Sequence, residues 1–339
     1  MGINNPLSVS LAVLEALFVK ADPRSVAFVK TAAGAASIKA GTKVGVGSSV
    51  VAFAADTGIT MPTLVAGSNY AVWVKSDGTI QATTNFTSAP DAGNWRKIGG
   101  FHYSPGGHSG ASGGGNATPQ INAYSFWDLK FCPACPDPRG MALVAGGFWA
   151  DIYGLGVEHL ANGTSAYNVT LADGGTPPRI PLAFGGTGSN AYASMTWFEA
   201  SEVLRSHGKR LPRYTEFAAL AYGTTENSAI GTDPATSSWS AAYVSKWGLA
   251  QVSGLMWWWG ADLLVNADAA TPAWSWQSQA GGRGQIYERG ANYLTAVILG
   301  GSWSNGSYCG SRCSYWTHSP AISAASFGAR GVCDHLVLA

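Results

Sequence analysis

Four short motifs in the second half of this 339-residue chain place the strongest constraint on its fold. In chain order they are GKRLP at Gly208–Pro212, GLMWWWG at Gly254–Gly260, LGGSW at Leu299–Trp303 and FGARGV at Phe327–Val332. Glycine permits tight turns and close backbone approach, and a buried tryptophan can anchor loops that have little regular structure. With 44 glycines and 14 tryptophans in the chain, the pattern predicts a loop-rich fold with a large aromatic core and little helix.

The charge balance and the hydropathy exclude several classes of protein. The 20 Lys and Arg residues and the 19 Asp and Glu residues leave a net charge of +1. A dedicated nucleic-acid binder normally carries a basic stripe, so we expect no nucleic-acid partner. No stretch reaches the ~18–20 consecutive apolar residues of a transmembrane helix, so we expect no membrane insertion. The apolar stretch Leu11–Val19 has no basic residue before it, and we therefore expect no secretory signal.

The length fits about two domains, and the first is predicted to be a β-sandwich over residues 16–128, after an N-terminal segment of residues 1–15. Short β-prone runs separated by turn residues are typical of an antiparallel sandwich. A glycine-rich stretch, residues 104–118, lies near the end of this domain, and its composition predicts a linker or mobile loop. The β-prone runs are Val26–Lys30, Ala36–Ala40, Thr42–Val46, Val50–Phe53, Asn69–Val74 and Thr79–Thr83.

The second domain, residues 129–339, contains most of the tryptophans and two helix signals. Thr196 is a suitable N-cap and Glu199 occupies the capping-box position, which predicts a helix over residues 196–207. A second helix is predicted over Arg213–Tyr222, because Gly223 follows it and glycine commonly ends a helix. Loops, short strands and aromatic residues are expected elsewhere.

The five cysteines leave three interpretations open. Cys132 and Cys135 form a C-x2-C pair, Cys309 and Cys313 form a C-x3-C pair, and Cys333 is isolated in the sequence. Such pairs can bind zinc, form disulfides or remain as packed thiols. No histidine lies at ligand spacing beside either pair, so a zinc site would require all four thiolates.

In this order and spacing, the four motifs resemble those of the C-type lectin fold in its formylglycine-generating-enzyme variety. A GKRLP-type helix start, a W-x-W core strand, a GGSW strand and a GxR ending recur in that variety. The resemblance implies an α+β fold that is mostly β and loops, in which a C-type-lectin-fold domain follows the N-terminal β-sandwich. A shared fold does not by itself assign a chemistry.

Seven segments give a closer resemblance, to the major tropism determinants of Bordetella phage. These are receptor-binding tips that a diversity-generating retroelement diversifies, and the similarity runs from about Leu17 to the end of the chain. Members of that family carry an additional small β-prism at the N-terminus, where this chain has residues 1–15. The resemblance implies a variable region at about residues 300–338. The segments are Ala36–Gly41, Ile59–Pro62, Gly99–Tyr103, Asp137–Met141, Phe148–Tyr153, Gly208–Pro212 and Gly328–Leu336.

The resemblance assigns eleven positions of the variable region to ligand binding. Retroelement mutagenesis of AAC or AAT codons cannot produce Lys, Glu, Gln, Met or Trp, and Gly300–Ala339 contains none of the first four. Tyrosine supplies contact area at low entropy cost, and serine and glycine supply adaptable shape, as a binding surface requires. The assigned positions are Ser302, Ser304, Gly306, Tyr308, Tyr315, Thr317, His318, Ile322, Ala324, Ser326 and Phe327.

The first four of these positions alternate, as side chains on one face of an extended strand do. Asn305 falls outside this alternation and is assigned to the scaffold. For Ile322 and Phe327 the alternative is a place in the core. Arg312 and Arg330 are expected to brace loops through carbonyl or carboxylate groups.

The resemblance implies a phage receptor-binding, tropism-determining protein at a tail-fibre tip, which acts on the virion at the host surface. The expected partners are a host cell-surface receptor, which we expect to be a protein, and other tail-fibre proteins. The resemblance also implies a homotrimer, in which several linked copies would raise a modest single-site affinity. One alternative is a bacterial or prophage-encoded display protein of the same diversified type, without a role in the virion.

The other alternative is an enzyme. Formylglycine-generating enzymes use a cysteine pair near the C-terminus for copper-dependent oxidation, and Cys309 and Cys313 lie in a similar region. Their spacing departs from that family's, so we expect a binding protein with no catalytic residues, no cofactor and no metal site. The calcium-site tripeptides Glu-Pro-Asn and Gln-Pro-Asp do not occur in the chain, which argues against calcium-dependent sugar binding.

Overall fold

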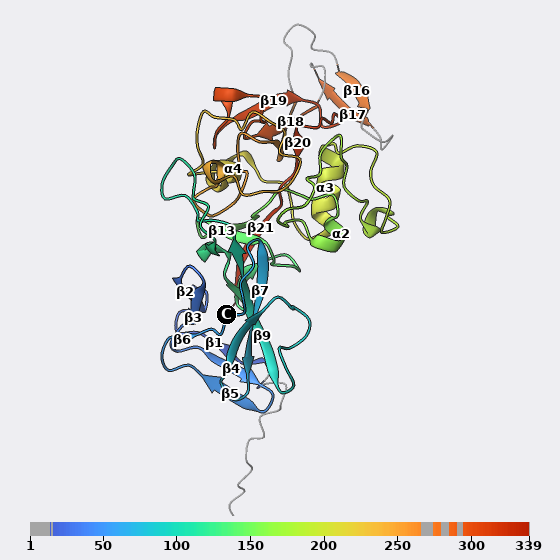
Figure 1. Cartoon of the computed structure of the whole chain (residues 1–339). Helices are drawn as coiled ribbons and strands as arrows, with labels where there is room; N and C mark the ends of the chain where they lie inside the picture. Colours follow the sequence, from blue (N-terminus) through green and yellow to red (C-terminus); the bar gives the residue numbers. More distant parts are fainter. Residues whose placement is uncertain (1–13, 15, 266–273, 279–284, 290–293, 339) are drawn as a thin grey trace, which may run out of the picture.

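The computed structural model describes Leu14 and residues 16–265, 274–278, 285–289 and 294–338. The molecule is elongated (Figure 1), with the first strands gathered at one end and strands from the last third of the chain at the other. Strands and loops dominate, and none of the helices described has the length and apolar character needed to span a bilayer. The predicted N-terminal segment, residues 1–15, lies outside the described residues apart from Leu14.

The six strands predicted for the first domain are all present. Strands β1, β4 and β5 form one antiparallel sheet, β2, β3 and β6 form another, and β7, β8 and β9 belong to a larger sheet. Gly47 and Gly78 have left-handed φ and lie in the turns between β4 and β5 and between β7 and β8. The bounds are β1 Phe18–Val19, β2 Phe28–Ala32, β3 Ala35–Ile38, β4 Lys43–Val46, β5 Ser49–Ala52, β6 Thr57–Gly58, β7 Ser68–Lys75, β8 Ile80–Thr83 and β9 Trp95–Ser104.

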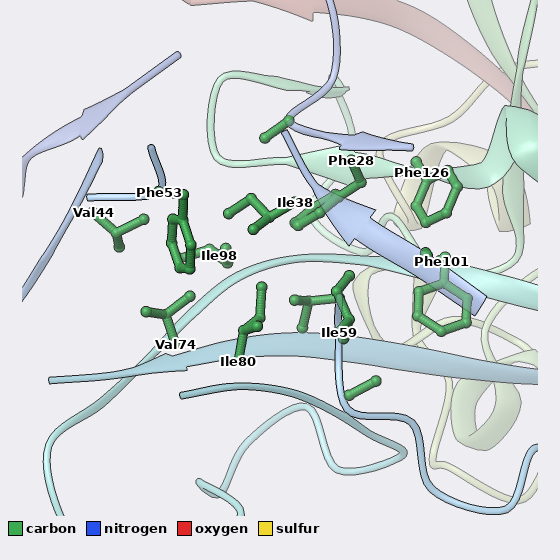
Figure 2. Packing of buried hydrophobic residues seen from close by; sticks show 14 of the residues in the cluster. Phe28, Ile38, Val44, Phe53, Ile59, Val74, Ile80, Ile98, Phe101 and Phe126 are labelled. Atoms are coloured by element: carbon green, nitrogen blue, oxygen red, sulfur yellow. The ribbon is translucent and has the colours of Figure 1, made fainter. Parts of the chain in front are cut away.

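The apolar side chains of these three sheets meet in one core (Figure 2). Val44 from the first small sheet, Ile38 from the second and Ile98 from the larger sheet are completely buried in it. Phe101 and Phe126 pack against each other at the end of this core, with ring centroids 5.6 Å apart. The two small sheets and the larger one therefore enclose a shared interior, as a β-sandwich does.

The glycine-rich stretch is a loop that connects the paired strands β9 and β10, so the prediction of a linker is wrong. The Gly115 N–H donates to the Ala241 carbonyl at 2.7 Å. A Cβ added at Gly106 would lie 2.1 Å from the indole nitrogen of Trp239. These glycines allow the backbone to pack closely against residues of the second half, a use of glycine that composition cannot distinguish from flexibility.

One sheet of nine described strands joins the two halves of the chain. Its order is β13-β14-β21-β12-β11-β9-β7-β8, with β10 paired to β9. Strand β21, near the end of the chain, lies between β12 and β14 (Figure 1), and the pairing of β12 with β11 and of β11 with β9 continues the sheet into the first predicted domain. The bounds are β10 Gln120–Ile121, β11 Trp127–Asp128, β12 Phe131–Pro133, β13 Met141–Val144, β14 Phe148–Asp151 and β21 Val332–Val337.

Helix α3 begins where the capping box predicts. Thr196 accepts a hydrogen bond from the Phe198 N–H at 3.2 Å, and the Glu199 carboxylate accepts one from the Thr196 N–H at 2.9 Å. The second predicted helix is also present, as α4. The bounds are α2 His159–Asn162, α3 Trp197–Ser206 and α4 Tyr214–Leu220, with 3-10 helices η1 Ala123–Ser125, η2 Leu182–Phe184, η3 Ala241–Tyr243 and η5 Gly306–Tyr308.

A four-stranded sheet, in the order β19-β18-β15-β20, lies at the end of the molecule away from β4 and β5 (Figure 1). Trp258 and Trp259 are consecutive in β15 and are buried in two different core clusters, because successive strand residues point to opposite faces. The bounds are β15 Trp257–Val265, β18 Leu294–Leu299, β19 Ser314–His318 and β20 Phe327–Gly328, with β16 Trp274–Ser278 and β17 Gln285–Arg289 as a separate antiparallel pair.

Arg330 braces the core of the second half, as the sequence predicts. Its buried guanidinium donates to the carbonyls of Asp151, Ile152 and Ala250 at 2.6, 2.8 and 2.6 Å. Burial lowers the pKa of Arg330 to about 10, so the side chain remains charged at neutral pH. The Asp151 carboxylate in turn pairs with the buried Lys209 ammonium at 2.6 Å. The Arg330 guanidinium therefore gives charged donors to buried carbonyls, and one of them, the Ile152 carbonyl, also accepts a hydrogen bond from the Ala250 N–H at 2.8 Å.

Arg330→Met is expected to lower the free energy of unfolding by about 3 kcal/mol, because three buried carbonyls lose a charged donor. Arg312→Met is the matched control at an exposed arginine, and we expect it to change that free energy by less than about 0.5 kcal/mol. Urea unfolding followed by tryptophan fluorescence measures both variants. Equal destabilisation by the two substitutions would contradict the bracing role of Arg330.

Candidate functional site

The eleven positions assigned to ligand binding lie around β18, β19 and β20, at one end of the molecule (Figure 1). Most of them are accessible to solvent. The exposed positions are Ser304, Gly306, Tyr308, Tyr315, Thr317 and Ile322, the half-buried ones are His318, Ala324 and Ser326, and the buried ones are Ser302 and Phe327.

The loop after β18 is not the extended strand that the alternation of its first positions predicts. Gly301 has a φ of +85°, and a Cβ added there would lie 2.5 Å from the Cys309 sulfur. The Asn305 side-chain oxygen accepts hydrogen bonds from the Ser302 N–H and hydroxyl at 2.9 and 2.6 Å. The predicted alternation is therefore wrong, because a left-handed glycine and a side-chain cap bend the backbone into a turn that continues as η5.

A cavity of about 740 Å³ opens among these positions. Tyr308 is 82% exposed and Tyr315 is 47% exposed at its rim, so large aromatic surfaces face solvent here. Lone exposed apolar residues are ordinary on a protein surface, but several around one hollow are typical of an interaction site. The lining residues are Trp257, Asn305, Tyr308, Arg312, Cys313, Ser314, Tyr315 and His318.

Aromatic contacts connect the cavity to the core. The ring centroids of Trp257 and Tyr315 are 6.3 Å apart, those of Tyr315 and His318 are 4.8 Å apart, and those of His318 and Phe327 are 5.2 Å apart. On a regular strand, Tyr315 and His318 would face opposite sides. An irregular register between β18 and β19 allows both to line the cavity.

The two buried positions lie beneath this surface. Ser302 is 2% exposed and Phe327 is 5% exposed. The Phe327 ring packs on Trp259 of the core, with centroids 5.2 Å apart, and supports His318 from below. For Phe327, the structure therefore matches the core alternative that the sequence left open.

Arg312 and Trp257 also line the cavity, although no sequence pattern assigns them to the site. The Arg312 side chain is exposed and lines the cavity, and its guanidinium has no hydrogen-bond or ion-pair partner within the described part of the chain. Arg312 braces a loop only through its backbone carbonyl, which accepts from the Tyr214 hydroxyl at 3.3 Å. Nothing in the sequence separates Trp257 from the two buried tryptophans that follow it. Tryptophan, tyrosine and arginine are enriched where binding energy concentrates in interfaces.

The cysteine pairs do not form the zinc site considered from the sequence. Within the described ranges, no group of three or more His, Cys, Asp or Glu side chains is arranged to hold a metal ion. Burial raises the pKa of the Cys309 and Cys313 thiols to about 11, so both are protonated at neutral pH. The Cys309 thiol donates to the Ser302 carbonyl at 3.3 Å. Neutral thiols packed in this way are poor nucleophiles, which favours a structural role.

Comparison with known proteins shows what the whole chain is similar to. Residues 26–128 match the family model described as the Mtd second domain. The chain is 50% identical to the tail fiber receptor-binding protein of Bordetella phage BPP-1, over 96% of this chain and 86% of that protein. The solved structures of the Major Tropism Determinant P3c and U1 variants each match with a TM-score of 0.91 and 48% identity, over 97% and 96% of this chain and 88% of each structure. The match confirms the predicted fold class, with a C-type-lectin-fold domain after the N-terminal β-sandwich.

Asn305→Ala is expected to lower the free energy of unfolding by about 1–2 kcal/mol, because the Ser302 N–H and hydroxyl lose their acceptor. Asn305→Asp keeps an oxygen at the same place and is expected to retain most of that stability. Thermal unfolding of the three proteins tests this. If the alanine and aspartate variants unfold alike, the side-chain acceptor does not hold the loop.

Proposed function

Because this chain belongs to the family of phage tail-fibre receptor-binding proteins that includes the major tropism determinants, we propose that it attaches a virion to a molecule on the surface of its host. As a tail-fibre protein, it is part of the virion and acts outside the host cell. The single observation that carries the proposal in this chain is the aromatic-rimmed cavity at the end of the molecule.

We assign the binding surface to the nine exposed or half-buried variable positions together with Trp257 and Arg312. Tyr308 and Tyr315 supply large rigid contact areas, and the small residues around them set the shape. Ser302 and Phe327 support this surface from beneath. The division leaves Trp257 and Arg312, which are not among the assigned variable positions, at the cavity with variable side chains around them.

The variation itself is proposed to come from a diversity-generating retroelement. The absence of Lys, Glu, Gln and Met from Gly300–Ala339 supports this origin. Sequencing the DNA downstream of the gene tests it: a near-copy of the Gly300–Leu338 coding stretch, differing at template adenines, is the expected finding. The variable positions would have to be reassigned if such a copy exists but differs at other codons.

We further propose a homotrimer held by other tail-fibre proteins, and a binding role without catalysis. Several copies per assembly would multiply a modest single-site affinity. Sedimentation equilibrium tests the trimer, since it should give three times the 35.1 kDa chain mass.

The neutral thiols of Cys309 and Cys313 support the absence of oxidase chemistry, and copper-dependent thiol oxidation by the purified protein would contradict it.

Tyr308→Ala and Tyr315→Ala are each expected to weaken adsorption of virions to host cells by about tenfold or more, because each removes an exposed aromatic contact at the cavity. Phe184→Ala removes an aromatic ring in η2 that is 42% exposed, close to the 47% of Tyr315, and is the matched control, with unchanged adsorption expected. The fraction of unbound particles measures the effect. Loss of adsorption in the control, or retention in both tyrosine variants, would place the binding surface elsewhere.

The receptor is proposed to be a protein. Proteinase treatment of host cells is therefore expected to abolish binding of the purified protein, whereas periodate oxidation of surface sugars and chelation of calcium with EDTA are expected to leave binding intact. Flow cytometry with fluorescently labelled protein measures all three conditions. Binding that survives proteinase but is lost after periodate would identify a glycan receptor instead.

A further inference from the structure

Cys135 and Cys333 face each other across neighbouring strands. The antiparallel register of β12 and β21 pairs Pro133 with His335. One position further, the Ala134 N–H donates to the Asp334 carbonyl at 2.9 Å, so the pairing continues past the end of β12. The next position therefore sets Cys135 opposite Cys333. Opposed residues in antiparallel strands have Cα atoms about 4.5–5.5 Å apart, which lies within the span of about 4.4–6.8 Å that a disulfide bridges.

The two side chains share one buried cluster. Cys135 is 8% exposed and Cys333 is 4% exposed, and both pack with Met141 and Trp149. The Cys135 thiol donates to the Asp137 carbonyl at 3.2 Å, and the proximity of the two thiols lowers the pKa of Cys135 and raises that of Cys333. The nearby Lys209 ammonium also favours the Cys135 thiolate. Cys135 is thus the better nucleophile, and the sulfur of Cys333 lies within its reach.

We propose that Cys135 and Cys333 form an oxidisable pair that becomes a disulfide bond when the protein meets an oxidising medium, with a small-molecule disulfide as the oxidant. The Cys135 thiolate attacks one sulfur of the oxidant, and one small thiolate leaves. The Cys333 thiolate then attacks the Cys135 sulfur of the mixed disulfide and releases the second small thiolate. The two protons lost by the cysteines go to the two released thiolates, so the oxidant takes up both electrons.

The register selects this pair over the pairs that are close in sequence. Cys132 is half-buried at the edge of the cluster that contains Cys135 and Cys333, and it lies opposite Leu336 in the ladder, three positions from Cys333. Burial raises the pKa of Cys132. Cys309 and Cys313 belong to the loop below the cavity and are both protonated at neutral pH.

The bond would act within the sheet that continues from the second predicted domain into the first. It would fasten β21, which lies between β12 and β14, to the segment after β12. It would close a loop of about 200 residues, and long loops lose much conformational freedom when they are cross-linked. Disulfides persist on virions and in other extracellular settings, whereas the cytoplasm keeps thiols reduced. The pair would therefore be reduced in the newly made protein and oxidised in the released virion.

Peptide mapping of the full chain tests the proposal directly. The purified, reduced protein is incubated with oxidised glutathione, both folded and during refolding from urea. Its free thiols are then blocked with N-ethylmaleimide and the protein is digested with trypsin without reduction. The expected product joins residues 131–139 to residues 331–339 and carries one maleimide, on Cys132, while Cys309 and Cys313 are fully blocked. The proposal is overturned if residues 331–339 carry a maleimide on Cys333 after both incubations.

Single substitutions provide the matched controls. Cys132→Ala is expected to leave the cross-link in place, whereas Cys135→Ala and Cys333→Ala are expected to abolish it. Oxidised wild-type protein should melt about 5 °C or more above the reduced protein, and this difference should vanish in Cys333→Ala. A cross-link that persists in Cys135→Ala and disappears in Cys132→Ala would assign the bond to the other cysteine and refute the register argument.

Discussion

The buried guanidinium of Arg330 is the interaction on which the loop-rich half of the molecule depends. A domain with few long strands or helices leaves many buried carbonyls without a partner from a regular ladder. Arg330 supplies charged donors to carbonyls from β14 and from the loop at Ala250. The Asp151 carboxylate, which pairs with Lys209, places a counter-charge on one of the same residues. A hydrophobic core alone could not hold these loops, because it offers no donor for their polar groups.

This braced interior supports irregular structure in the same half of the molecule, at the loop after β18 and the cavity. The glycines and Asn305 fix the loop after β18 through backbone geometry and one side-chain cap. Phe327 transmits the support of Trp259 to the rings at the cavity. The side chains that we propose for binding therefore extend from a surface whose shape is set by residues beneath it. Preorganisation of this kind reduces the entropy that a binding surface loses when it meets its partner.

Features that depend on local sequence could be predicted, and those that depend on distant pairing could not. The capping box at Thr196 and the six early strands follow from neighbouring residues. The glycine-rich stretch was misassigned as a linker because composition does not show that β9 and β10, the strands on either side of it, pair with each other. The proximity of Cys333 to Cys135 follows from the register of β12 and β21, which no local pattern encodes. Arg312 and Arg330 look alike in sequence, and burial alone separates their roles.

The arrangement of exposed and buried positions also sets how far such a surface can vary. A side chain that faces solvent, such as Tyr308 or Thr317, contributes little to folding, and its replacement changes stability by roughly 0.5 kcal/mol or less. Phe327 is different because it fills the space between the core and the cavity, where loss of an aromatic ring costs about 3–5 kcal/mol. Variation at Phe327 would therefore change the shape of the cavity and the stability of the domain together. Selection for a new partner could use the exposed positions freely. A change at Phe327 would be retained only where the surrounding core can repack around the new side chain.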